Sequence, residues 1–136
     1  MIDISDKKEG AREALASGFI HLSEESLKAI TEGTVREKSG DITVTALEYE
    51  AYIEMAESTM QNILAGSIKK FALIDAVAVH RIGRLGIGEA SIAIAVSAQH
   101  RKEGFDGCSE ILNRIKAEAP IWKKDIIDEK ITRWHD

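Results

Sequence analysis

The stretch FALIDAVAVHRIGRLGIGEASIAIAVSAQH, residues 71–100, decides the fold class of this sequence. Its two ends, 71–83 and 90–100, are apolar and rich in β-branched residues, which favours buried strands. The glycine-rich segment GRLGIG between them, residues 83–88, predicts a hairpin-like connection. This segment lacks the Lys-Ser/Thr of a phosphate-binding P-loop, and no helix pattern follows it. We therefore expect two central strands joined by a flexible link.

The sequence before these strands carries further strand and helix signals. Residues 2–5 predict a short strand, and residues 7–17 predict a helix. The segment 26–37 is ambiguous, because its alternation favours a strand whereas its Leu, Lys, Ala and Glu content favours a helix. The residues SGD, 39–41, predict a turn, and the alternation over 42–50 is typical of a half-buried strand.

Two longer helices are also predicted. The first begins at Tyr52 and ends near Gly66, with apolar residues recurring three and four positions apart. The second ends before Pro120, because proline lacks an N–H group and clashes with the preceding turn. We expect its apolar face to consist of Phe105, Cys108, Ile111, Leu112 and Ile115. Strands and helices are mixed without strict alternation, which predicts an α+β fold with a mainly antiparallel sheet and packed helices.

Composition and charge exclude several classes of protein. A length of 136 residues fits a single domain, 1–136. The net charge of −5 argues against general nucleic-acid binding, and no apolar run approaches the roughly 20 residues that span a membrane. The first ten residues lack the apolar region of a signal peptide, so we expect a cytoplasmic protein. Neither the single cysteine nor His80 has partners at metal-ligand spacing, so no metal site is predicted.

Lys116 lies at the edge of the apolar face of the last predicted helix. A lysine in this position can be partly desolvated, which would lower its pKa and make the amine a better nucleophile or base. The alternative is that its stem lies on the core while its charge stays in water, and geometry alone favours this second reading. Cys108, in the middle of the same face, is expected to be a core residue.

Other basic residues lie where strands or helices end. His100 and Arg101 fall between a strand and the last helix, where free N–H groups and a guanidinium could bind phosphate or carboxylate. Arg36 lies between an expected strand and a turn. Structural histidines and surface arginines are equally common, so residue chemistry alone indicates no more than binding of a phosphorylated small molecule.

Several segments, in order, make the sequence similar to one known family. They are GTVRE (33–37), LEYEAYIEMAE (47–57), VHRIGRLGIGE (79–89), SAQHRKEGF (97–105) and RIKAEAPIWKKD (114–125). Together these segments cover most of the chain from Gly33 onward. On this basis the sequence resembles the large, catalytic subunit of molybdopterin synthase.

The resemblance implies a fold, a reaction and partners. It implies an α/β-hammerhead fold and a homodimer at the centre of a heterotetramer with two small ubiquitin-like sulfur-carrier subunits, each ending in a Gly-Gly thiocarboxylate. It implies that the carrier tail enters a pocket of the large subunit. Two sulfurs, delivered in successive rounds, then convert cyclic pyranopterin monophosphate (precursor Z) into the dithiolene of molybdopterin, with no metal or organic cofactor. The alternative is a non-catalytic dimeric module that binds a ubiquitin-like tail or a phosphorylated metabolite.

The same resemblance implies roles for individual residues. Lys116 and Lys123 match the catalytic lysines, and the division of roles between them stays open. The residues that match substrate contacts, besides these two lysines, are Thr34, Val35, Arg36, His100, Arg101, Lys124 and Asp125. The His100–Arg101 pair is expected to reach the pocket from across the dimer. Pro120 is expected to be the bend that brings Lys123 back toward Lys116.

Overall fold

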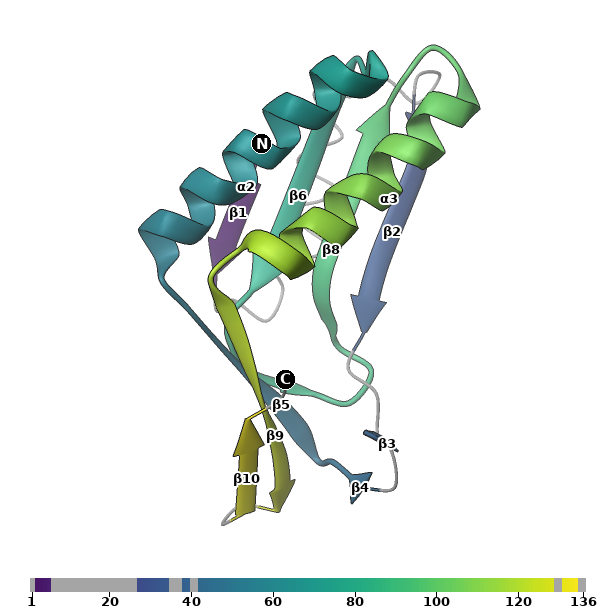
Figure 1. Cartoon of the computed structure of the whole chain (residues 1–136). Coiled ribbons are helices and arrows are strands. Elements are labelled where there is room, and N and C mark those ends of the chain that lie inside the picture. The colour runs from purple at the N-terminus through teal and green to yellow at the C-terminus, as the bar shows by residue number, and fades with distance from the viewer. Residues whose placement is uncertain (1, 6–26, 35–37, 40–41, 129–130, 135–136) are drawn as a thin grey trace.

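The computed structural model describes residues 2–5, 27–34, 38–39, 42–128 and 131–134, with side chains described for 43–127. The elements of these segments follow one another along the chain and are drawn in Figure 1. They are β1 (Ile2–Ser5), β2 (Leu27–Thr34), β3 (Lys38–Ser39), β4 (Ile42–Thr43), β5 (Ala46–Ala51), α2 (Ile53–Phe71), β6 (Asp75–Arg81), β7 (Gly83–Gly86), β8 (Ala90–Ser97), α3 (Arg101–Glu118), β9 (Ile121–Asp128) and β10 (Ile131–Trp134).

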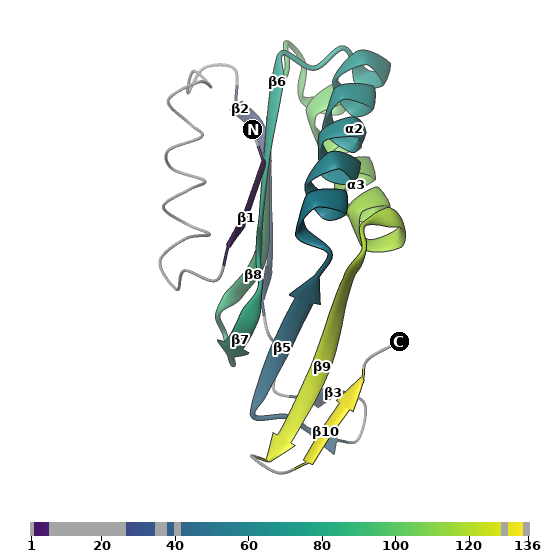
Figure 2. The same cartoon turned by 90° about the vertical axis from the view of Figure 1, so that its left-hand side faces the viewer.

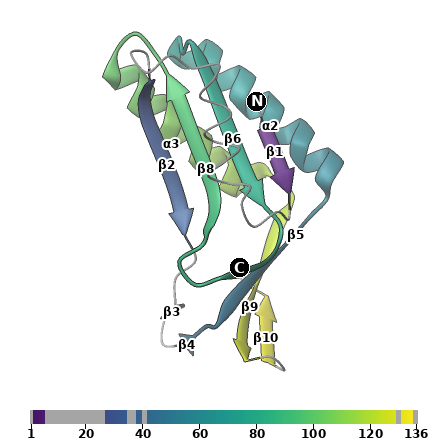
Figure 3. The ribbon, with the colours of Figure 1, turned by 180° about the vertical axis from the view of Figure 1, so that it is seen from behind.

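Two sheets make up most of the strand structure. In the first, the strand order is β1-β6-β8-β2, and only the β1–β6 pair is parallel (Figure 3). In the second, β10-β9-β5-β7, every pair is antiparallel. Helices α2 and α3 lie side by side on one face of the first sheet, and β5 and β9 lead from their ends into the second sheet (Figure 2). The predicted α+β class with a mainly antiparallel sheet is confirmed.

The main core lies between the two helices and the first sheet. Met60, Ile63 and Leu64 of α2 and Ile111 of α3 are at most 2% exposed, and they form a cluster with side chains of β6 and β8. The opposite face of the same strands is also buried, at positions such as Val77. Burial on both faces explains why β6 and β8 have continuous apolar sequences rather than alternating ones.

The predicted boundary between the first long helix and the following strand is wrong. Helix α2 continues through Gly66 to Phe71, and Ala72 ends it in the left-handed conformation, with φ of 53°. Strand β6 therefore begins at Asp75 rather than at residue 71. Packing of α2 against α3 and the first sheet outweighs the cost of one helical glycine, which is about 1 kcal/mol.

The connection between the central strands is also more complex than a hairpin. Strands β6 and β8 pair antiparallel as predicted, but Gly83–Gly86 of the linking segment form β7, which pairs with β5 in the second sheet. The chain then turns at Gly88, where φ is +82°, a value that favours glycine. This segment therefore ties the two sheets together.

The structure tests some of the predictions made for the first 50 residues. The strand at Ile2–Ser5 is confirmed, and the ambiguous segment contains strand β2. The expected strand over 42–50 is divided into β4 and β5 by a break at Val44 and Thr45. The helix expected over 7–17 and most of the turn at 39–41 lie outside the described residues.

The last helix, α3, is confirmed, although one member of its predicted apolar face is not in the core. Phe105 is 61% exposed, while Gly104 and Gly107 lie on the buried side. Because glycine has no side chain, α3 can pack closely against Leu73, which follows α2. A Cβ atom on Gly107 would lie only 3.0 Å from the Leu73 side chain. As predicted, the helix ends just before Pro120. Neither of the helices in the described part of the chain is both long and apolar enough to span a membrane.

Candidate functional site

The two lysines matched to catalytic positions lie on either side of Pro120. Lys116 is exposed in the last turn of α3, which supports the reading in which its charge stays in water. Lys123 is half-buried in β9 and lies opposite Tyr49 of β5. After Pro120 the chain continues as a strand into the second sheet (Figure 2). Convergence of the two amines stays a prediction.

Lys124 and Asp125 follow Lys123 but differ from it in environment. Successive side chains of a strand point to opposite faces, so Lys124 lies on the face away from Lys123. There its Nζ lies 3.2 Å from Oε2 of Glu48, its direct neighbour on β5. Asp125 returns to the Lys123 face and is completely buried. Of the three neighbours, Lys123 and Asp125 therefore share one face.

Tyr49 connects this face of the second sheet to the first sheet. Its ring meets the His80 ring edge-on, with centroids 5.1 Å apart. Burial raises the pKa of Tyr49, the Asp125 charge adds to this, and a hydrogen bond with Ser91 opposes it. His80 Nδ1 lies 2.7 Å from the Arg81 carbonyl oxygen, which can only accept, so Nδ1 carries the proton. Burial lowers the pKa of His80 to about 4, so the ring is neutral at physiological pH.

Arg81 is also buried. Its guanidinium forms an ion pair within the chain and is not exposed for ligand binding. Its Nη1 donates to Oε2 of Glu89 at 2.8 Å, and only 4% of Arg81 is exposed. This pair joins the end of β6 to the residue before β8. We infer that this ion pair stabilises the place where the chain passes between the two sheets.

His100 and Arg101 lie at the opposite end of α3 from Lys116. His100 is the N-cap residue without a side-chain capping hydrogen bond, Arg101 begins the helix, and both are exposed. Because a helix rises about 1.5 Å per residue, Arg101 and Lys116 are separated by about 22 Å along its axis. One copy of the chain therefore does not bring this pair to its own Lys116.

The remaining predicted contacts are Thr34, Val35 and Arg36, at the end of β2 and in the residues that follow it in the sequence. Thr34 is the last residue of β2, and its Cα lies opposite Ala90 of β8. Val35 and Arg36 lie outside the described residues. Their predicted roles are not tested by the geometry.

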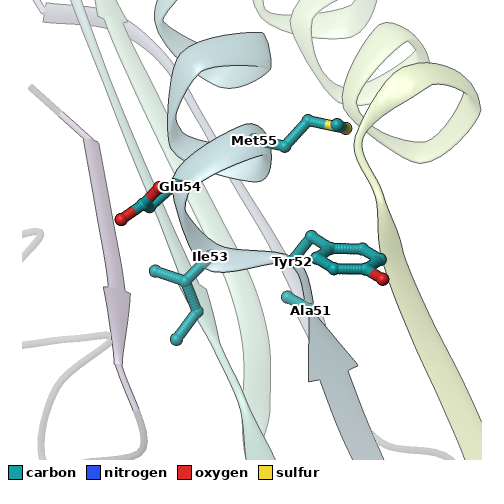
Figure 4. Close-up of a pocket in the computed structure, with 5 residues that line it drawn as sticks. All are labelled: Ala51, Tyr52, Ile53, Glu54 and Met55. Carbon is teal, nitrogen blue, oxygen red and sulfur yellow. The ribbon is translucent and has the colours of Figure 1, made fainter.

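An exposed apolar surface lies beside Pro120. An open hollow of about 400 Å³ is lined by Ala51, Tyr52, Ile53, Glu54 and Met55 (Figure 4). The Tyr52 N–H donates to the Pro120 carbonyl at 3.2 Å, and the Tyr52 ring meets Trp122 edge-on at 5.6 Å. Tyr52 and Met55 are at least 60% exposed, and Trp122 is 46% exposed. Such a surface is suited to contact an apolar segment of another protein.

Sequence reasoning missed the contacts across the sheets. The alternation of LEYEA could have indicated that Leu47 and Tyr49 share a face, but nothing local identifies His80 as the partner of Tyr49. The exposed pair of Tyr52 and Trp122 likewise depends on the pairing of β5 with β9. These contacts join segments that are far apart in the sequence.

Comparison with known proteins identifies the family. Residues 23–118 match the family described as MoaE protein. The molybdopterin synthase catalytic subunit of Thermoplasma volcanium is 45% identical over 76% of this chain and 76% of its own length. The proteins of the same name from Pyrococcus abyssi and Homo sapiens are 41% and 39% identical, over 71% and 74% of this chain. The chain spans about two thirds of the former and about half of the latter.

Solved structures agree with this assignment. The crystal structure of molybdopterin synthase from Staphylococcus aureus superposes with a TM-score of 0.80 at 34% identity, covering 89% of each chain. A complex of subunits 1 and 2 of molybdopterin-converting factor from Helicobacter pylori gives a TM-score of 0.77 over 99% of this chain and 90% of that one. At 19% identity, the latter shows the fold alone. With the sequence matches, these findings show that the chain belongs to the MoaE family, as the resemblance predicted.

Proposed function

We propose that this chain is the catalytic subunit of a molybdopterin synthase. It transfers sulfur from the C-terminal thiocarboxylate of a small ubiquitin-like carrier to cyclic pyranopterin monophosphate, precursor Z, and so forms the dithiolene of molybdopterin. Membership of the MoaE family supports the reaction. The observation that carries the assignment to residues is that basic residues are exposed at both ends of α3, His100 and Arg101 at its start and Lys116 in its last turn. We expect the reaction to take place in the cytoplasm.

The site is shared between two copies of the chain. The separation of about 22 Å along α3 keeps Arg101 away from Lys116 of the same copy. A homodimer can supply His100 and Arg101 from one copy to Lys116 of the other. This arrangement supports the heterotetramer in which each of two large subunits binds one carrier.

Each basic residue has a separate role in the proposed reaction. Arg101, His100 and Arg36 neutralise the substrate phosphate, for which a guanidinium is well suited. Lys116 meets the acyl end of the carrier and stabilises the negative charge that develops there, or attacks it transiently. Lys123 assists proton transfers or holds the pterin. No metal or organic cofactor takes part in this scheme.

The other matched residues have supporting roles in the proposal. Thr34 and Val35 lead into the Arg36 segment and border the substrate. Lys124 contributes positive charge from a position where Glu48 already pairs with it. Direct contact of Asp125 with substrate stays a prediction from the resemblance, and its complete burial argues instead for a role in holding the Lys123 face of the sheet.

The carrier binds next to the α3–β9 connection. The apolar surface of Tyr52, Met55 and Trp122 adjoins Pro120, four residues after Lys116, and offers apolar contacts to the carrier. Trp122→Ala should therefore weaken binding of the carrier, measured by titration calorimetry. Ile74→Ala, which changes an exposed apolar residue in the loop after α2, is the control and should leave binding unchanged.

A single-turnover assay tests the proposed reaction. Purified chain, thiocarboxylated carrier and precursor Z are mixed, and molybdopterin is measured over time for the wild type, Lys116→Ala and Lys102→Ala. Lys102 is an exposed lysine on the same helix and serves as a matched control. We expect product from the wild type and Lys102→Ala, and a loss of about 100-fold or more for Lys116→Ala, in line with removal of one charge-stabilising group.

Two outcomes would overturn the proposal. A folded wild type that binds the carrier but forms no product would indicate the non-catalytic binding module instead. Equal rates for the wild type and Lys116→Ala would remove Lys116 from the chemistry.

A further inference from the structure

Tyr49 lies directly beside Lys123 in the second sheet. In the pairing of β5 with β9, Tyr49 is opposite Lys123, and in the pairing of β5 with β7 it is opposite Gly83. Side chains of directly opposite residues project to the same face of a sheet, with their Cβ atoms about 4.5–5.5 Å apart. Because Gly83 has no side chain, Lys123 supplies the side chain next to the Tyr49 ring in this row of three strands.

The Tyr49 ring is held from the first sheet. His80 of β6 meets it edge-on, with ring centroids 5.1 Å apart, and Ser91 of β8 forms a hydrogen bond with its hydroxyl group. His80 and Ser91 are each only 6% exposed, so the surrounding core fixes both of them. Within the second sheet the ring packs against Leu47 and Leu85. Contacts with the ring and with its hydroxyl group therefore hold Tyr49 in one orientation.

A fixed ring restricts the Lys123 side chain. A lysine has a flexible four-carbon stem, and it loses rotamer entropy when its amine is held in one place. Lys123 is half-buried, and the strand register brings its stem alongside the Tyr49 ring. The ring excludes the stem conformations that would cross its own position, so the amine is confined to a smaller region before the substrate arrives.

Asp125 adds a negative charge to the same face of the sheet. It lies two residues after Lys123 on β9, so both side chains project to one face, and it is completely buried. Burial raises the pKa of Tyr49 above its ordinary value of 10, and the Asp125 charge adds to this, so the ring stays neutral at physiological pH. Lys123 therefore lies beside an uncharged ring, with a carboxylate on the same face that attracts its ammonium group.

We propose that Tyr49 is a positioning residue for Lys123: its ring, fixed by His80 and Ser91, is the surface along which the lysine stem lies. The inference rests on the proposed function in one respect, namely that Lys123 acts in sulfur transfer. It adds the way in which the amine is held in place. Through Tyr49, the position of this amine depends on the buried strands β6 and β8 of the first sheet, and not on β9 alone.

Nuclear magnetic resonance of the chain labelled with ¹³C at lysine tests the contact. Protons close to an aromatic ring are displaced from their ordinary resonance positions by the ring current. The Lys123 methylene signals, identified by their loss in Lys123→Arg, should be displaced in the wild type and return to ordinary lysine positions in Tyr49→Leu. The signals of Lys102, an exposed lysine on α3, should be the same in both proteins. Wild-type Lys123 signals at ordinary positions would refute the inference, whether or not the variant folds.

The single-turnover assay tests the consequence for the reaction. Tyr49→Leu removes the ring and should lower the rate at saturating precursor Z by about 10- to 100-fold, because a displacement of about 1 Å can cost about 100-fold. Tyr49→Phe keeps the ring and its contact with His80, so it should restore most of the rate. Leu85→Val is a matched control in the same apolar cluster, on the strand away from Lys123, and should leave the rate unchanged.

The results separate positioning from a general effect on the sheet. A Tyr49→Leu variant as fast as the wild type would overturn the inference, and so would equal losses in Tyr49→Leu and Tyr49→Phe or in Tyr49→Leu and Leu85→Val. The resonance measurement does not depend on activity. Displaced Lys123 signals in a wild type that forms no molybdopterin would refute the proposed function alone, and an active wild type with Lys123 signals at ordinary positions would refute this inference alone.

Discussion

Acidification should destabilise the chain through His80. This side chain is 6% exposed, and burial lowers its pKa from 6.5 to about 4. The unfolded chain recovers the ordinary value, so below about pH 6.5 it binds a proton that the folded chain does not. The stabilising effect of a neutral His80 is therefore complete above about pH 6.5 and is lost as the pH falls toward 4. Since one pKa unit corresponds to about 1.4 kcal/mol, the loss between pH 7 and pH 4 is about 3 kcal/mol.

The assay compares urea unfolding of the wild type and His80→Gln at pH 7 and pH 4, followed by tryptophan fluorescence at one protein concentration. Glutamine can donate to the Arg81 carbonyl but does not titrate, so the wild type should lose about 3 kcal/mol more than the variant on acidification. Carboxylates titrate in both proteins and cancel in the difference. Equal pH dependence of the wild type and His80→Gln would refute the reasoning.

Further predictions concern helix packing and the buried thiol. Gly107→Ala would place a Cβ atom 3.0 Å from two methyl groups of Leu73, and such overpacking should lower the free energy of unfolding by about 1–3 kcal/mol. Gly66→Ala, whose nearest neighbour would be 3.6 Å away, should instead raise it by up to about 1 kcal/mol, and equal effects in urea unfolding would contradict this contrast. Burial raises the pKa of Cys108 to about 11, so a disulfide reagent at neutral pH should label it only after unfolding. Rapid labelling of the folded chain would show that the thiol is accessible.

Strands β6 and β8 and helix α3 could be predicted from the sequence because their signals are local. Strands β6 and β8 carry continuous apolar runs, and Pro120 marks the end of α3. The extent of α2 could not be predicted, since Gly66 reads as a stop signal unless the packing around it is known. Strand β7 was missed for a similar reason, because its glycines resemble a turn and its partner β5 lies far away in the sequence.

The places of the candidate site residues along the helices and strands could be predicted from the sequence, but the contacts between the two sheets could not. The placement of His100 and Arg101 at the start of α3 follows from local pattern, and so does the exposed position of Lys116 near its end. The contact between Tyr49 and His80 depends on how the two sheets meet, which no local pattern specifies. The separation of Arg101 from Lys116 follows from the length of α3, and the proposed function uses a second copy of the chain to span this distance.

The most direct test of the account uses mixed dimers. Arg101→Ala and Lys116→Ala chains carrying different affinity tags are produced together, and dimers with one chain of each kind are purified and assayed for molybdopterin formation. If each pocket combines Arg101 of one copy with Lys116 of the other, one of the two pockets is intact, and the mixed dimer should have about half of the wild-type activity while each parent variant is nearly inactive. A mixed dimer no more active than its parents, beside an active wild type, would contradict the shared site.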